Sequence, residues 1–85
     1  MHNKLEIFRK KLIYRAGHRG TKEMDILLSA FVNKYIGTFD ESLLVELDEF
    51  LNLEDEVILD FYQKGIIQKK IKKSKIFEIF KNFKL

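Results

Sequence analysis

Apolar side chains recur along the first two thirds of this chain at intervals of three and four residues, the spacing of one face of an α-helix. Glycines and capping residues interrupt the pattern near residues 17–20, 37–40 and 52–55. The pattern therefore predicts four helices. The first covers about 3–16, and the second runs from about 21 to before 37. The third follows a cap at Thr38 and has inward positions as far as Leu51, and the fourth follows a cap at Asn52 and ends before Gly65. The predicted inward positions are Leu5, Phe8, Leu12, Ile13, Met24, Leu27, Leu28, Phe31, Tyr35, Leu43, Leu44, Leu47, Phe50, Leu51, Val57, Ile58, Phe61 and Tyr62.

The helix ends are predicted from glycine and from capping residues, because the chain has no proline. Gly17 and Gly65 are expected to end the first and fourth helices, and Thr21 to cap the second. Thr38 and Glu41 have the spacing of a capping box, in which two side chains satisfy free backbone N–H groups at a helix start. The third helix is therefore predicted to begin with Thr38 as its cap.

Residues 66–85 differ from the rest of the chain because apolar positions alternate there with many lysines. Isoleucine and phenylalanine at helical spacing allow an amphipathic helix, but neighbouring like charges weaken it by roughly a few tenths of a kcal/mol per pair. We therefore divide the chain into a helical bundle core at 1–65 and a basic C-terminal helix or tail at 66–85. This tail is expected to dock on the acidic residues of 40–60 or to become ordered only on a partner.

Charge along the chain forms three blocks, with +5 over residues 1–39, −9 over 40–60 and +7 over 61–85. Because these blocks can satisfy one another, the net charge of +3 says little about nucleic acid. The absence of cysteine excludes a disulfide framework and a thiolate metal site. No apolar run approaches the roughly 20 residues of a membrane span, and the N-terminus shows no cleavable signal. These features predict a soluble intracellular protein without a transmembrane segment.

The turn between the first two helices, YRAGHRGTKEMD at residues 14–25, is the predicted working surface. Arg19 and Glu23 would stand at the exposed start of the second helix, where the helix dipole stabilises a carboxylate and free N–H groups can meet a partner. Gly20 would allow positive φ or close backbone approach. The alternative interpretation of Arg19 and Glu23 is a plain surface ion pair, which contributes only about 0.3 to 0.5 kcal/mol.

Two further residues of this region carry weaker expectations. His18 is expected in the exposed turn, where it would add a proton-dependent charge, and no metal site is expected because no ligand cluster accompanies it. Phe61 occupies an inward position of the fourth helix and is expected to pack in the core while remaining partly exposed.

Around the turn, the chain resembles the small FAD assembly factors of succinate dehydrogenase, bacterial proteins with mitochondrial counterparts. The resemblance covers about residues 11–65 and rests on the motif RGxxE, here Arg19, Gly20 and Glu23. It departs from the family pattern at Thr21, which replaces an apolar residue, and at Phe61, which replaces a tryptophan. The remaining matching positions are Leu12, Ile13, Tyr14, Asp25, Leu27, Leu28, Phe31, Phe39, Asp40, Glu41, Phe50, Leu51, Glu54, Asp55, Leu59 and Asp60.

The resemblance implies a small five-helix bundle that binds the flavoprotein subunit of succinate dehydrogenase, and in bacteria often fumarate reductase as well. It implies that binding promotes covalent attachment of FAD to a histidine of that subunit, with the chemistry taking place in the partner. The implied assembly factor is a bacterial cytoplasmic protein. It is not an enzyme, holds no cofactor or metal stably, and acts as a monomer. The implied partner-binding residues are Arg19, Gly20, Glu23, Asp25, His18 and Phe61.

Other classes of function remain open from the residues alone. A helical nucleic-acid-binding domain would use the lysines of the first helix and of the tail, although the −9 block and the scarcity of arginine oppose it. A membrane-surface protein would lay residues 66–85 in the lipid interface. An enzyme has the least support, because no nucleophile set, phosphate-binding glycine loop or metal-ligand cluster is recognisable.

Overall fold

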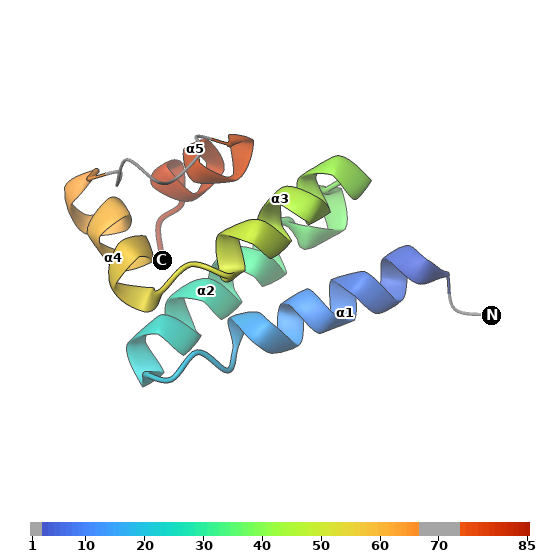
Figure 1. Cartoon of the computed structure of the whole chain (residues 1–85), viewed down its shortest axis with the longest axis horizontal. Helices are drawn as coiled ribbons and strands as arrows, with labels where there is room; N and C mark the ends of the chain where they lie inside the picture. Colours follow the sequence, from blue (N-terminus) through green and yellow to red (C-terminus); the bar gives the residue numbers. More distant parts are fainter. Residues whose placement is uncertain (1–2, 67–73) are drawn as a thin grey trace.

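The computed structural model describes residues 3–66 and 74–85, and within these residues the chain folds into five α-helices and no strand (Figure 1). This result confirms the predicted all-α class and the five-helix bundle. The elements are α1 (Lys4–Ala16), α2 (Lys22–Tyr35), the short 3-10 helix η1 (Ile36–Thr38), α3 (Glu41–Leu51), α4 (Asp55–Lys64) and α5 (Lys75–Asn82).

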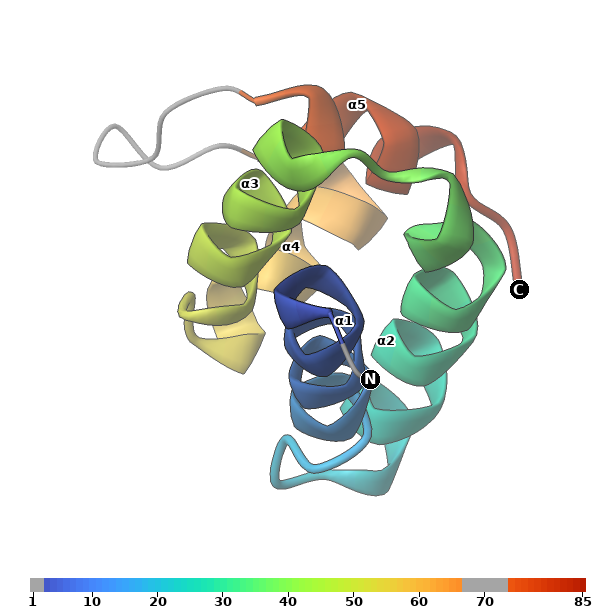
Figure 2. The same ribbon diagram turned by 90° about the vertical axis from the view of Figure 1, so that its right-hand side faces the viewer.

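The arrangement places α1 between α2 and α3, as the view along α1 shows in Figure 2. α5 packs against α3 and α4 on the other side of the bundle. The connection from α1 to α2 and the connection from α3 to α4 lie at the same end of the molecule (Figure 1). Two segments more than thirty residues apart in the sequence therefore share one surface. Within residues 3–66 and 74–85, no helix combines the length and the apolar character needed to cross a membrane.

Aromatic side chains from four elements form the centre of the core. The Phe80 ring of α5 lies 4.8 Å from Phe31 of α2, 5.1 Å from Phe50 of α3 and 4.9 Å from Tyr62 of α4, measured between ring centroids. Phe83, just after α5, is also buried and lies 5.5 Å from Phe31. Such edge-on and tilted pairs add to the free energy gained by burying the rings.

The C-terminal segment docks on α3 and α4 through these rings rather than through its lysines. The expected docking on the acidic residues of 40–60 has one polar contact among the described residues, from the backbone N–H of Lys75 to the carboxylate of Glu46 at 3.3 Å. Lys75, Lys81 and Lys84 are exposed. The other lysines of the predicted tail belong to residues 67–73, which lie outside the described residues.

Several predicted helix ends are confirmed, but the capping box before α3 and the cap predicted for α4 are wrong. Asn52 follows the end of α3 instead of capping α4, which begins after Glu54. Thr21 caps α2, since its hydroxyl accepts the N–H of Met24 at 3.3 Å, and Gly65 ends α4 with a φ of 69°. The cap of α3 is Asp40, whose carboxylate accepts the N–H of Leu43 at 2.9 Å. Thr38 is instead the last residue of η1, and its hydroxyl donates to the backbone carbonyl of Tyr35. The 3-10 helix continues directly from α2, so α3 begins later than predicted.

Candidate functional site

The segment that joins α1 to α2, residues 17–21, forms a tight corner, and we use this name for it below. Gly17 ends α1, and its N–H bonds the carbonyls of Ile13 and Tyr14. A Cβ atom on Gly17 would lie 3.0 Å from the Ser29 hydroxyl oxygen, so glycine permits the close approach of α2. Gly20 has a φ of 140°, a conformation that L side chains rarely adopt. Two glycines and a capping threonine thus fix the path of the corner.

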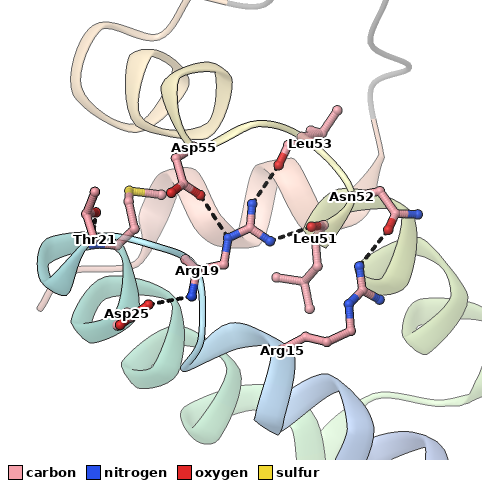
Figure 3. A network of polar contacts seen from close by, with 9 residues as sticks. Arg15, Arg19, Thr21, Asp25, Leu51, Asn52, Leu53 and Asp55 are labelled. Carbon is pink, nitrogen blue, oxygen red and sulfur yellow. Dashed lines mark hydrogen bonds and ion pairs between the residues drawn. The ribbon is translucent and has the colours of Figure 1, made fainter.

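Arg19 points inward from the corner, with only 11% of its side chain exposed. Its Nε donates to the Asp55 carboxylate at 2.9 Å, Nη1 donates to the carbonyl of Leu51, and Nη2 donates to the carbonyl of Leu53 at 2.6 Å (Figure 3). Its backbone N–H donates to the Asp25 carboxylate at 2.5 Å. The sequence-based expectation that this arginine faces outward is therefore wrong.

The acceptors of Arg19 explain why its side chain turns inward. The last carbonyls of a helix lack partners within the helix and carry partial negative charge. The guanidinium satisfies one such carbonyl, that of Leu51 at the end of α3. In the same planar fork it bonds the carbonyl of Leu53 in the connection after α3 and the carboxylate of Asp55 in the first turn of α4. A partner 36 residues away, Asp55, thus replaces the i, i+4 pair with Glu23 that the alternative interpretation required.

The other predicted contact residues divide between surface and interior. His18, Gly20 and Glu23 are exposed, and Asp25 is half-buried under its bond from Arg19. Phe61 is 4% exposed, and its ring stands edge-on to Phe77 at 4.8 Å. The expected partial exposure of Phe61 is wrong because α5 covers this side of α4.

The sequence interpretation included Tyr14 in the predicted working surface but gave its side chain no role there. Tyr14 is 64% exposed, and its ring stacks on His18 with centroids 3.9 Å apart and planes 16° from parallel. His18 Nδ1 lies 2.7 Å from the carbonyl oxygen of Tyr14, and because a carbonyl only accepts, this nitrogen carries the proton. The spacing of four residues across the end of α1 was the available signal.

Arg15 and Asp55 are the other residues that the sequence interpretation left unassigned. Arg15 forms an ion pair with Asp48 of α3 and donates Nη2 to the side-chain oxygen of Asn52 at 2.6 Å. Together with Arg19, it ties the end of α1 and the corner to the end of α3 (Figure 3). For both Arg15 and Asp55, the available signal was the opposite charge of the first two sequence blocks. This signal does not indicate which residues pair.

Comparison with known proteins places this geometry in a family. The family model described as "flavinator of succinate dehydrogenase" matches residues 10–84. The chain is similar to the protein named "succinate dehydrogenase assembly factor 2, mitochondrial" of Scheffersomyces stipitis, with 47% identity over 58 residues, which is 68% of this chain and 37% of that protein. The proteins of the same name from Debaryomyces hansenii and Danio rerio are 38% and 44% identical over 58 and 48 residues, or 68% and 56% of this chain and 39% and 30% of theirs.

These relatives correct one expectation and limit another. They are mitochondrial proteins of eukaryotes, so the prediction of a bacterial cytoplasmic protein is wrong. The matched part of this chain spans between 30% and 39% of the length of these three relatives. No solved structure matches the chain. Because the family model extends over nearly all of the sequence, from the middle of α1 to beyond α5, the chain belongs to the succinate dehydrogenase flavinator family.

Proposed function

We propose that this protein assists the assembly of succinate dehydrogenase by binding its flavoprotein subunit and promoting covalent attachment of FAD there. The family membership and the names of the relatives support this proposal. The observation that carries it to particular residues is the rigid corner, which leaves Gly20 and Glu23 exposed beside the start of α2. In this proposal the protein is not a catalyst, and the FAD belongs to the flavoprotein.

The corner is suited to entering a cleft of a partner protein. Apart from Gly20 itself and its two neighbours in the chain, no heavy atom lies within 4 Å of the place where a Cβ of Gly20 would stand, so a partner's backbone can approach this position closely. Glu23 follows in the first turn of α2, at the positive end of the helix dipole. A small rigid surface of this kind promotes a reaction in its partner by binding one conformation of that partner more tightly than others.

The alternative functions lose support from the placement of their key residues. The rings that a membrane-surface helix would insert into lipid, those of Phe77, Phe80 and Phe83, are buried in the core. Nucleic-acid binding would use the lysines of α1, and Lys4, Lys10 and Lys11 are exposed. The few arginines that could add to such a surface are instead bonded within the molecule, as described above for Arg15 and Arg19. Arg9 likewise donates to the carbonyl of Phe39 at 2.9 Å.

The direct test replaces Glu23 with alanine and measures flavin fluorescence of the denatured flavoprotein subunit on a gel. We expect covalent flavin to fall, because Glu23→Ala removes the exposed carboxylate while the caps and core of α2 remain. Glu41→Ala is the matched control, since Glu41 is also an exposed acid in the first turn of a helix but lies at the start of α3. Undiminished covalent flavin with Glu23→Ala, or an equal loss with Glu41→Ala, would contradict the assigned role.

A further inference from the structure

Arg19 is the structural link between the two connections at one end of the molecule. The corner belongs to residues 17–21, and the connection from α3 to α4 consists of residues 52–54. The side chain of Arg19 crosses from the first to the second and makes all three of its contacts with Leu51, Leu53 and Asp55. Neither connection has regular backbone bonding to the other, so this guanidinium supplies the polar contacts that join them.

The burial of Arg19 separates it from the exposed residues of its motif. Each of its three guanidinium nitrogens already donates a bond inside the protein, while Glu23 forms none of the ion pairs found among the described residues. The part of Arg19 that remains exposed lies in an open depression lined by residues 51–56. A partner that rests on the corner would therefore meet the connection from α3 to α4 as part of the same surface.

We propose that Arg19 is a positioning residue, which fastens the connection from α3 to α4 to the corner so that the two form one contact surface for the flavoprotein. This inference rests on the proposed function. In it, Gly20 and Glu23 meet the partner on one side, and the exposed Asn52 and Glu54 extend the surface on the other. Arg19 acts through Asp55 and the two carbonyls, and not through contact with the partner.

Lysine cannot replace arginine in this role, which makes Arg19→Lys an informative variant. A lysine keeps the positive charge, but its single ammonium group cannot present three donors in a plane to acceptors on two helices. If Arg19 only attracted the partner electrostatically, lysine would preserve most of the affinity. If Arg19 positions the connection, lysine releases residues 52–54 and the affinity falls.

The test is a double-mutant cycle on the affinity for the flavoprotein subunit of succinate dehydrogenase from the same organism, purified before covalent attachment of FAD. The variants are Arg19→Lys, Asp55→Ala and the two combined, with affinity measured by calorimetry. We expect the dissociation constant to rise about tenfold for Arg19→Lys, about threefold for Asp55→Ala and only about tenfold for the double variant, because both changes break one linkage. Losses that multiply to about thirtyfold would show that Arg19 touches the partner itself, and would overturn the inference.

A second measurement on the free protein covers the case in which Arg19→Lys binds poorly only because it is unstable. Amide hydrogen exchange at residues 52–56 should speed up in both Arg19→Lys and Asp55→Ala, while the amides of α2 stay protected. Unchanged exchange at 52–56 in both variants would also overturn the inference. Asp55→Ala keeps the bonds from Arg19 to Leu51 and Leu53, so it is the variant better able to remain folded.

Arg9→Lys is the matched control for general destabilisation. Arg9 is also a partly buried arginine that donates to a backbone carbonyl. That carbonyl belongs to Phe39, which lies just before the start of α3, whereas Arg19 binds at the end of α3. Arg9→Lys should lower the melting temperature and leave the affinity for the flavoprotein subunit unchanged. A loss of affinity equal to that of Arg19→Lys would overturn the inference. Absence of binding by the wild-type protein would refute the proposed function and this inference with it. Wild-type binding combined with multiplying losses would refute the inference alone.

Discussion

The burial of the C-terminal segment in the core gives a prediction that can be worked out in detail at Phe80. This side chain is fully buried, and rings from α2, α3 and α4 surround it at centroid distances of 4.8 to 5.1 Å. Truncating such a residue to alanine loses its transfer free energy and leaves a cavity, which together cost about 3 to 5 kcal/mol. The free energy of unfolding of a small domain is only about 5 to 15 kcal/mol in total, so Phe80→Ala should leave the protein barely folded.

The milder variant Phe80→Leu allows the effect to be measured within the folded range. It keeps an apolar side chain but loses the edge-on ring contacts, and we expect it to lower the free energy of unfolding by about 1 to 1.5 kcal/mol. For a chain of this size, each kcal/mol corresponds to about 4 to 8 °C in melting temperature. Phe80→Leu should therefore melt about 4 to 12 °C below the wild type, followed by far-ultraviolet circular dichroism.

Lys81→Ala is the control for this measurement because Lys81 is the next residue of α5 and is exposed. A surface substitution of this kind should change the free energy of unfolding by no more than about 0.5 kcal/mol. If Phe80→Leu and Lys81→Ala melted at the same temperature as the wild type, the rings of α5 would not be part of the cooperative core. The reasoning from the aromatic contacts would then be refuted.

Two pairs of substitutions test the helix ends by urea unfolding. Gly65→Ala should cost about 1 kcal/mol because its φ of 69° disfavours a side chain, whereas Gly37→Ala, whose φ is not positive and whose added Cβ has open space, should be neutral or slightly stabilising. Equal effects would contradict this account of Gly65. Asp40→Ala should also cost about 1 kcal/mol through loss of the cap of α3, and Thr38→Ala less; the reverse order would restore the capping box that the sequence suggested.

The helix boundaries could be predicted from the sequence where the deciding interactions are local. Thr21 bonds a backbone N–H three residues ahead, and Gly65 ends α4 by its own conformation, so neighbouring letters contain the information. Before α3, two capping candidates stand two residues apart, and both fit local rules. The choice of Asp40 over Thr38 accompanies the burial of Phe39 and the bond from Arg9 to its carbonyl. Arg9 lies too far from residue 40 in the sequence for local capping rules to include it.

The packing of residues 74–85 through aromatic rings follows from the relative size of two free energies. Repulsion between neighbouring lysines costs roughly a few tenths of a kcal/mol per pair, while burying a phenylalanine contributes about 1.5 to 3 kcal/mol. Phe77, Phe80 and Phe83 together outweigh the repulsion, but only because Phe31 and Phe50 are placed to receive them. Those receiving rings come from far earlier in the chain, so the sequence pattern of 66–85 could not reveal them.

The three charge blocks predicted that opposite charges would meet, but not which ones. Two ion pairs join the first basic block to the acidic block. Arg15 pairs with Asp48, 33 residues away in the sequence, and Arg19 pairs with Asp55, 36 residues away. Among the described residues, Lys64 with Asp60 is the pair from the second basic block, and it is a local i, i+4 pair of exposed side chains. Exposed pairs of this type contribute little, so the informative pairs are those that hold the corner.

The spacing of the RGxxE motif acquires a physical meaning once its residues are placed. Arg19 and Glu23 are four residues apart, which on a helix would put them on one face, but Arg19 precedes the cap Thr21 and so is not helical. The glycine between them has a φ of 140°, a backbone conformation that L side chains rarely adopt. This is why the arginine can point into the bundle while the glutamate, in the first turn of α2, points to solvent. One short motif thus combines an internal anchor with an exposed carboxylate, and a helical i, i+4 interpretation of the same letters necessarily misses the division.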